Sequence, residues 1–292
     1  MLRSVLFCLF FGCLGSSAAL AAAPQRGDAL GASSLGGAGT ARTEMINQII
    51  DDSGIGAVIE QLPAMVESGF DQQPPPPVGR EKYERFKADF VEAFEPLRLR
   101  QSLVVYMQEH YDDERFAALS DLLDDPLVKK MTALEVELNT PEGQQEMMQM
   151  GGSLMNNLSS ERRALVRRLD EATRATQLAL DVQMMMVGTM MRSMNKIVPA
   201  DKRMSVSQMD QMLDQMRMQF RDPINQYTQL GFVYAYRDVD DAELERYIAL
   251  YESDLGRWST EMFRDAWLKL SASVSRELSR KLQDGGGGAL AP

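Results

Sequence analysis

Methionine is the residue whose number and spacing most clearly suggest chemistry in this sequence. Sixteen of the 21 methionines fall between Met131 and Met218. Thioether sulfur is a soft ligand that suits Cu(I), and residues three, four or seven positions apart share one face of a helix. Two candidate ligand sets follow from these spacings: Met184, Met191 and Met194, and Met209, Met212 and Met216.

The same spacings also describe apolar stripes that a helix buries. Leu213 and Phe220 continue the second methionine stripe without any ligand value. Packing in a core or at an interface is therefore the preferred interpretation, since methionine fills irregular apolar surfaces well. A peptide-binding groove is an alternative, and the residues predicted for a partner-binding face are Met186, Met190, Phe220, Trp258 and Trp267.

Three pairs of adjacent aspartates could instead indicate a carboxylate-dependent hydrolase acting on cell-wall material. The pairs are Asp112-Asp113, Asp124-Asp125 and Asp240-Asp241. Neighbouring residues do not face each other on a helix, and none of the pairs lies in the alternating frame with a Gly turn that a Ca²⁺ loop needs. Capping of helix N-termini by Asp112, Asp125 and Asp240 is the preferred role, with Glu243 completing a capping box.

The remaining catalytic chemistries lack their residues. The chain has one histidine, His110, and no G-x-S-x-G turn that would present a serine nucleophile beside it. We therefore predict no catalytic residue, no resident cofactor and a chain that is not an enzyme.

The charge balance argues against a polyanionic partner. The formal net charge is −11, which opposes binding to nucleic acid. A local basic cluster from Arg162 to Arg174 is interleaved with Glu161, Asp170 and Glu171, which predicts a salt-bridged helix face. The expected partner is a protein or peptide, and a homo-oligomer is a further possibility.

The N-terminus has the layout of an export signal. Arg3 precedes a short apolar run and a small-residue stretch, so residues 1–21 are predicted to be a signal peptide. The run is too short for a stable membrane span. Lipoprotein anchoring through Cys13 is not favoured, because the residues before this cysteine are not the small and aliphatic ones that lipidation requires. The predicted location is the periplasm, with a flexible leader over residues 22–43 and a disordered Gly-rich tail over 284–292.

The elements that position these residues are predicted to be helices arranged as two tandem, divergent repeats, residues 44–158 and 159–283. Tyr106 to Leu134 aligns without a gap on Tyr234 to Met262, at an offset of 128 positions. The same offset places Ile59, Leu62 and Val66 on Val187, Met190 and Met194. Apolar residues recur at helical spacing throughout, including long stretches from Ser160 to Asn195 and from Ser205 to Phe220, and no strand pattern is present. The expected fold class is all-α, with helical bundles.

The segment from Phe86 to Leu138 resembles the bacterial domain-of-unknown-function family 2059. The matching pieces are Ile46 to Val66, Phe86 to Phe94, Leu103 to Tyr106, Asp112 to Leu123, and Asp124-Asp125-Pro126. The second repeat has a related junction from Leu250 to Gly256, without the proline of the family pattern, while the first lacks its aromatic pair and glycine. The resemblance implies an exported all-helical protein and no established activity. Taken together, the sequence favours a non-catalytic periplasmic binding or scaffolding protein.

Overall fold

The computed structural model describes residues 37–71, 80–197 and 200–286, and within these ranges every regular element is a helix. The predicted all-α fold class is therefore confirmed. Among these residues no helix is long and apolar enough to cross a membrane. The predicted signal peptide, most of the predicted leader and the end of the tail lie outside the described residues.

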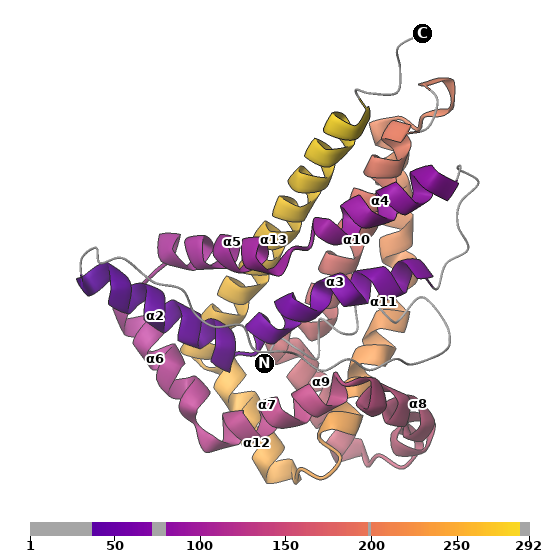
Figure 1. Cartoon of the computed structure of the whole chain (residues 1–292). Coiled ribbons are helices and arrows are strands. Elements are labelled where there is room, and N and C mark those ends of the chain that lie inside the picture. Colours follow the sequence, from indigo (N-terminus) through magenta and orange to yellow (C-terminus); the bar gives the residue numbers. More distant parts are fainter. Residues whose placement is uncertain (1–36, 72–79, 198–199, 287–292) are drawn as a thin grey trace.

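The helices follow one another with short connections (Figure 1). In chain order they are α2 (Gly37–Asp52), α3 (Ile55–Asp71), α4 (Arg80–Glu92), α5 (Pro96–Glu109), α6 (Asp113–Asp124), α7 (Pro126–Leu138), α8 (Pro141–Asn156), α9 (Ser160–Thr173), α10 (Ala175–Ile197), the 3-10 turn η1 (Ala200–Lys202), α11 (Val206–Ala235), α12 (Asp241–Glu252) and α13 (Asp254–Gly286).

The aspartates predicted as caps do begin helices. The side chains of Asp112, Asp125 and Asp240 each accept a hydrogen bond from a backbone N–H in the first turn of α6, α7 and α12. Each cap of this kind is worth about 1 kcal/mol. The carboxylate of Glu243 does not complete the expected capping box but lies 2.6 Å from Lys130 Nζ.

Three predicted boundaries differ from the structure. α2 begins at Gly37, inside the predicted leader, and α13 continues to Gly286, inside the predicted tail. The stretch from Ser160 to Asn195, predicted as one helical run, is broken at Arg174, where φ is +52°. A positive φ ends an α-helix, and glycine usually marks such a position, so an arginine there gave no signal of the break.

Several helices of the two halves of the chain begin or end at corresponding positions. At the offset of 128, both ends of α6 fall on the ends of α12, and the start of α7 falls on the start of α13. Pro96, at the start of α5, falls one position after Pro223, which lies inside α11. These coincidences favour the predicted duplication, which itself stays a prediction.

The offset of 128 does not hold for the first two helices of each half. The left-handed residue between α2 and α3 is Gly54, with φ +80°, and the one between α9 and α10 is Arg174. These positions differ by 120, as do the starts of α3 and α10. An offset of 120 places Ile59 on Ala179 and Leu62 on Val182, all of which are buried. The predicted match of Ile59, Leu62 and Val66 to Val187, Met190 and Met194 at the offset of 128 stays a prediction, like the duplication to which it belongs.

The last helices of each half also pack on the other half. α7 and α8 pack on α11 of the second half, and α13 packs on α4, α5 and α6 of the first half as well as on α10 and α12 of its own (Figure 1). The buried apolar residues form one continuous cluster that includes Ile46 in α2 and Leu278 in α13. The predicted ranges 44–158 and 159–283 therefore share one core.

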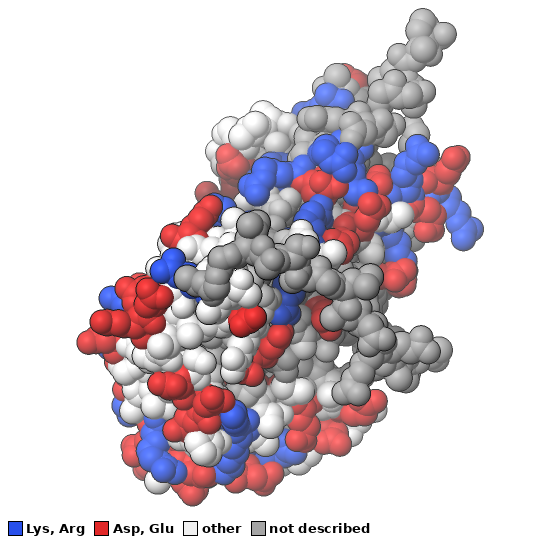
Figure 2. All heavy atoms as spheres, turned by 60° about the vertical axis from the view of Figure 1, so that its left-hand side comes forward, with Lys and Arg blue, Asp and Glu red and all other residues white. Residues whose placement is uncertain are grey.

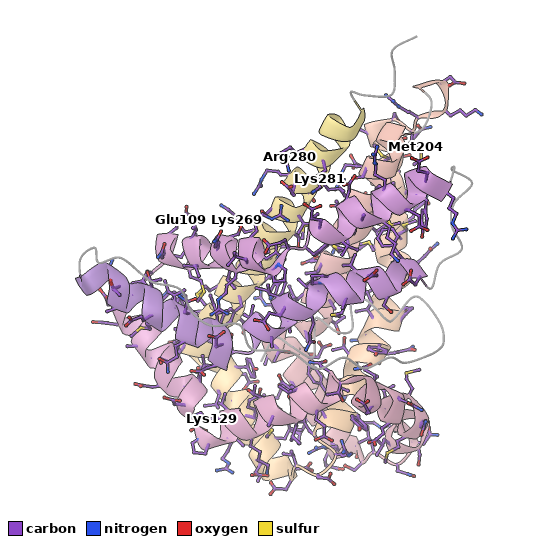
Figure 3. The ribbon with its side chains drawn as sticks, in the orientation of Figure 1. Glu109, Lys129, Met204, Lys269, Arg280 and Lys281 are labelled. Atoms are coloured by element: carbon purple, nitrogen blue, oxygen red, sulfur yellow. The ribbon has the colours of Figure 1, made fainter. Side chains whose placement is uncertain are left out.

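Charged contacts also tie the two halves together at one end of the molecule. Lys281 Nζ lies 2.6 Å from Glu92 Oε1, and Arg98 lies 3.3 Å from Glu277, so the second half of α13 is tied to α4 and α5. Figure 3 shows Lys281 on this part of α13, whereas Lys129, at the start of α7, lies at the opposite end of the molecule. Ion pairs at a protein surface contribute little singly, so the shared core supplies most of the stabilisation.

The shared core predicts one cooperative unfolding transition for both halves. Both tryptophans, Trp258 and Trp267, lie in the second half, whereas Ile49 is fully buried in α2. Ile49→Ala should cost about 3 kcal/mol, as expected for a truncated buried isoleucine. Urea unfolding followed by tryptophan fluorescence should shift by the same amount as unfolding followed by circular dichroism. A fluorescence transition that stays at its wild-type midpoint would show that the halves unfold independently.

Candidate functional site

The predicted methionine ligands lie along the antiparallel hairpin of α10 and α11. The side chain of Asn195 is hydrogen-bonded to the backbone N–H and carbonyl of Met204 at the end of this hairpin (Figure 3). Further along, Arg217 is paired with Asp181 at 2.7 Å. Residues seven apart in a helix are separated by about 10 Å along its axis, so Met184 and Met191 lie at different levels of the hairpin.

The exposure of these methionines also varies. Met184 and Met209 are buried, Met191 and Met216 are partly buried, and Met212 is exposed; the side chain of Met194 is not among those described. Packing between the helices accounts for the buried and partly buried positions. Among the described residues, no group of three or more His, Cys, Asp or Glu side chains is placed to hold a metal.

The predicted partner-binding face is not one surface. Trp267 is 3% exposed, so its expected place on an accessible face was wrong: its indole fills the core beside Leu62 and Phe94. Trp258 packs edge-on against Phe116 of α6. Met186, Met190 and Phe220 are partly buried against the core. Their helical stripe was recognised correctly as apolar, but it faces neighbouring helices.

His110 and the basic cluster take structural positions. His110 is exposed and stacked on Tyr106, with Nδ1 2.8 Å from the Tyr106 carbonyl oxygen. Arg162 and Arg168 pair with Asp241 and Glu252 of α12, so the partners are on a neighbouring helix and not on α9 as expected. On the face in Figure 2, basic and acidic side chains are interspersed without a continuous basic patch.

The sequence did not predict a polar cleft that lies where the junction of α9 and α10 meets α11. Its volume is about 440 Å³, and we call it the Asp170 cleft. The residues that line it are Asp170, Glu171, Arg174, Thr176, Gln177, Leu180, Arg221, Asp222 and Asn225.

Asp170 fixes the geometry of this cleft. Its Oδ1 accepts the backbone N–H of Thr176 at 2.8 Å, and its Oδ2 accepts the Thr176 hydroxyl at 2.7 Å and the Asn225 amide at 3.1 Å. Burial raises the pKa of the Asp170 carboxyl above its ordinary value, although these hydrogen bonds act in the opposite direction. One carboxylate therefore joins the end of α9, the start of α10 and the side of α11.

Two unusual features of the helix backbone lie next to the same cleft. Arg174 is the one non-glycine residue with a positive φ in the described part of the chain. This conformation costs an L-residue about 1–2 kcal/mol, and the equivalent position in the first half is Gly54. Pro223 lies inside α11 beside Asp222, and a proline cannot donate the hydrogen bond that a helix interior requires. Local strain of this kind concentrates at functional sites.

A second polar group is enclosed in the core. Glu135 of α7 is 2% exposed and accepts hydrogen bonds from the hydroxyls of Tyr236 at 2.5 Å and Tyr247 at 3.0 Å. The hydroxyls of Tyr247 and Tyr251 are 3.1 Å apart. We call these four residues the Glu135 cluster. Its members come from both halves, so it connects α7 to α11 and α12.

Three of the four cluster positions have apolar counterparts at the predicted repeat offset of 128. Glu135 corresponds to Phe263, and Tyr247 and Tyr251 correspond to Leu119 and Leu123, which are all buried, whereas Tyr236 corresponds to the exposed Gln108. All four side chains of the Glu135 cluster are at most 4% exposed, so we assign the cluster a structural role and not that of a ligand site.

The Glu135 cluster predicts a loss of stability at alkaline pH. Burial, followed by the negative charge of Glu135, raises the pKa of Tyr236 and of Tyr247 well above 10, and burial likewise raises that of Tyr251. Above pH 10 the unfolded chain loses phenolic protons that the folded chain keeps, so the free energy of unfolding falls as pH rises. Each pH unit over which one tyrosine behaves in this way costs about 1.4 kcal/mol.

Urea midpoints measured from neutral pH to about one unit above the ordinary tyrosine pKa of 10 should show this decline. The double variant Tyr247→Phe and Tyr251→Phe should decline less steeply over the same range. Parallel curves for the two proteins would contradict the role assigned to these tyrosines.

Little in the sequence pointed to the Asp170 cleft. Asp170 and Arg174 were interpreted as part of a salt-bridged face, and the helix break that exposes them carries no glycine. Pro223 was the one available signal, since a proline within a helical pattern marks a departure from regular packing. No family model matches the chain, and neither a curated protein nor a solved structure matches it.

Proposed function

We propose that this chain is a non-catalytic periplasmic binding protein whose ligand is a small polar molecule held in the Asp170 cleft. The observation that supports this proposal most directly is the unpaired charge in this cleft. Among the described residues, Glu171, Arg221 and Asp222 line it without an ion pair or a side-chain hydrogen bond, although many other arginines of the chain are paired.

The composition of the cleft supports binding and not turnover. Its most buried carboxylate, Asp170, has both oxygens occupied by Thr176 and Asn225, so it is a positioning group. No histidine, cysteine or serine lines the cleft. The Thr176 hydroxyl is its one candidate nucleophile, and the Asp170 carboxylate to which it donates is also held by the Thr176 N–H and the Asn225 amide, so we assign this contact to positioning. In each aspartate pair that suggested a hydrolase, one residue caps a helix and the other forms an ion pair, which weakens that alternative.

The cleft has the dimensions of a small-molecule site. Ligand pockets usually occupy about 300–1,000 Å³ and hold a few fixed polar groups that orient the ligand. Here the fixed groups come from two sides, since Asp170 and Thr176 belong to the junction of α9 and α10, whereas Asn225 belongs to α11. Gln229 in turn donates to Asn225 Oδ1 at 2.9 Å and helps to hold that amide in place.

Isothermal titration calorimetry of the purified chain against a panel of small charged molecules tests this proposal. The panel contains inorganic phosphate, a short diamine, a free amino acid and a short peptide. At least one should bind, and Arg221→Gln should weaken its binding if it carries an anionic group, or strengthen it if it is the diamine. The matched control is Arg246→Gln, which removes an exposed arginine of α12 that does not line the cleft. Absence of binding by every member, or equal effects of the two variants, would overturn the proposal.

A further inference from the structure

The Asp170 cleft carries both signs of charge on both of its walls. The wall formed by the end of α9 supplies Glu171 and the junction residue Arg174, and the wall formed by α11 supplies Arg221 and Asp222. All four side chains are exposed to solvent in the structure. Both helices therefore present a guanidinium and a carboxylate to one shared space.

This arrangement restricts the charge of a ligand. A simple anion would be attracted by Arg174 and Arg221 but repelled by Glu171 and Asp222. A simple cation would be attracted by the two carboxylates but repelled by the two guanidinium groups. A molecule that carries both charges can pair with both sets. Guanidinium groups bind carboxylates with two parallel hydrogen bonds, and carboxylates accept hydrogen bonds from ammonium groups.

The carboxylate of Asp170 is not available to a ligand. Its two oxygens already accept three hydrogen bonds from Thr176 and Asn225. The pairing of Arg174 with Glu261 of α13 is long, at 3.6 Å, and both side chains are more than half exposed. Such a pair contributes little and can be exchanged for a ligand carboxylate.

Arginine occupies position 174, where glycine would be more favourable for the stability of the fold. The equivalent residue of the first half is Gly54, which adopts a positive φ without a steric penalty. Arginine at this position accepts that penalty, and its side chain lines the cleft. A residue that costs stability and places a guanidinium in a cleft is expected where binding needs that guanidinium.

From these observations we infer that the Asp170 cleft binds a short peptide with free termini, its carboxylate held by Arg174 and Arg221 and its ammonium group by Glu171 and Asp222. The cleft volume of about 440 Å³ suits a peptide of a few residues. This inference rests on the proposed function and adds the chemical class of the ligand.

The test uses trialanine as the probe, with two derivatives in which either the amino group is acetylated or the carboxyl group is amidated. Calorimetry on the purified chain should show binding of trialanine and a loss of about tenfold or more in affinity for each derivative, as expected when a charge-assisted contact is removed. Arg221→Gln should weaken trialanine binding but leave the weaker binding of the amidated derivative nearly unchanged. Arg246→Gln should alter neither.

A second variant separates binding from folding. Arg174→Gly removes the guanidinium and relieves the positive φ, so it should unfold at a higher urea concentration than the wild type while binding trialanine about tenfold more weakly. Lower stability or unchanged affinity would overturn the role given to Arg174.

The outcomes distinguish this inference from the proposed function. Binding of phosphate or of the diamine in preference to trialanine, with sensitivity to Arg221→Gln, would overturn the peptide assignment and leave the cleft as a binding site. Equal affinity for trialanine and its blocked derivatives would have the same meaning. Failure of every probe to bind would overturn both.

Discussion

Glu135→Ala is expected to destabilise the protein by about 4 kcal/mol, because it leaves buried tyrosine hydroxyls without their acceptor and creates a cavity. The hydroxyls of Tyr236 and Tyr247 both donate to Glu135, and both tyrosines are 1% exposed or less. Each unsatisfied buried group costs about 1–3 kcal/mol, and water cannot replace the carboxylate without opening the core. Urea denaturation at neutral pH measures the loss directly.

A pair of controls separates the hydrogen bonds from the volume. Glu135→Gln keeps an oxygen acceptor in nearly the same place and should cost only about 1 kcal/mol. In Glu135→Leu the side-chain volume is largely retained but the acceptor is lost, so its effect should approach that of alanine. A glutamine variant as unstable as the alanine variant would show that the charge of Glu135, and not its acceptor oxygen, stabilises this junction.

The apolar equivalent of the Glu135 cluster suggests a compensating variant. The buried residues Phe263, Leu119 and Leu123 stand at three of the corresponding positions at the offset of 128, so we expect apolar side chains to be tolerated here. Adding Tyr236→Phe, Tyr247→Phe and Tyr251→Phe to Glu135→Leu should recover part of the lost stability. Replacing a complete buried polar group with apolar side chains is often neutral, whereas removing one member is not.

Much of the fold was predictable from local patterns. Helical spacing around Phe116 and Leu244, with Asp112 and Asp240 ahead of them, located α6 and α12 and their starts correctly. The backbone N–H groups of a first helical turn need acceptors wherever the helix lies, so such signals do not depend on tertiary packing. The packing of α7, α8 and α13 across the two halves was not predictable, because an apolar stripe does not specify which neighbour buries it.

The candidate site was missed for a related reason. The Asp170 cleft depends on a chain break at Arg174 and on the meeting of Asp170 with Asn225, 55 positions later. An arginine with a positive φ leaves no mark in a pattern of helix formers. The methionines attracted attention by their number, yet their spacing is that of packed helix faces, and Met184 and Met209 are buried.

Gly256→Ala is the second change for which we expect a large loss, of about 3 kcal/mol. A Cβ at this position, in the first turn of α13, would lie 2.6 Å from the Cα of Tyr251 and still closer to the Leu250 carbonyl oxygen. Both are backbone atoms at the end of α12, so no side-chain rotation relieves the clash and the two helices must separate. Forced overpacking of a closely packed site costs about 1–3 kcal/mol, and a backbone clash belongs at the upper end.

Gly152→Ala is the matched control for this prediction. Gly152 lies inside α8, is exposed, and has no heavy atom within 4 Å of the position that a Cβ would occupy. Alanine should therefore stabilise the protein by about 0.5–1 kcal/mol through its higher helix propensity. The same chemical change thus has opposite expected signs at the two glycines, and urea midpoints of the two variants measure both. A Gly256→Ala protein as stable as the wild type would show that α12 and α13 can separate freely. Tyr251, at the end of α12, belongs to the Glu135 cluster, so this result would also weaken the assignment of that cluster as the group that holds α7 against α12.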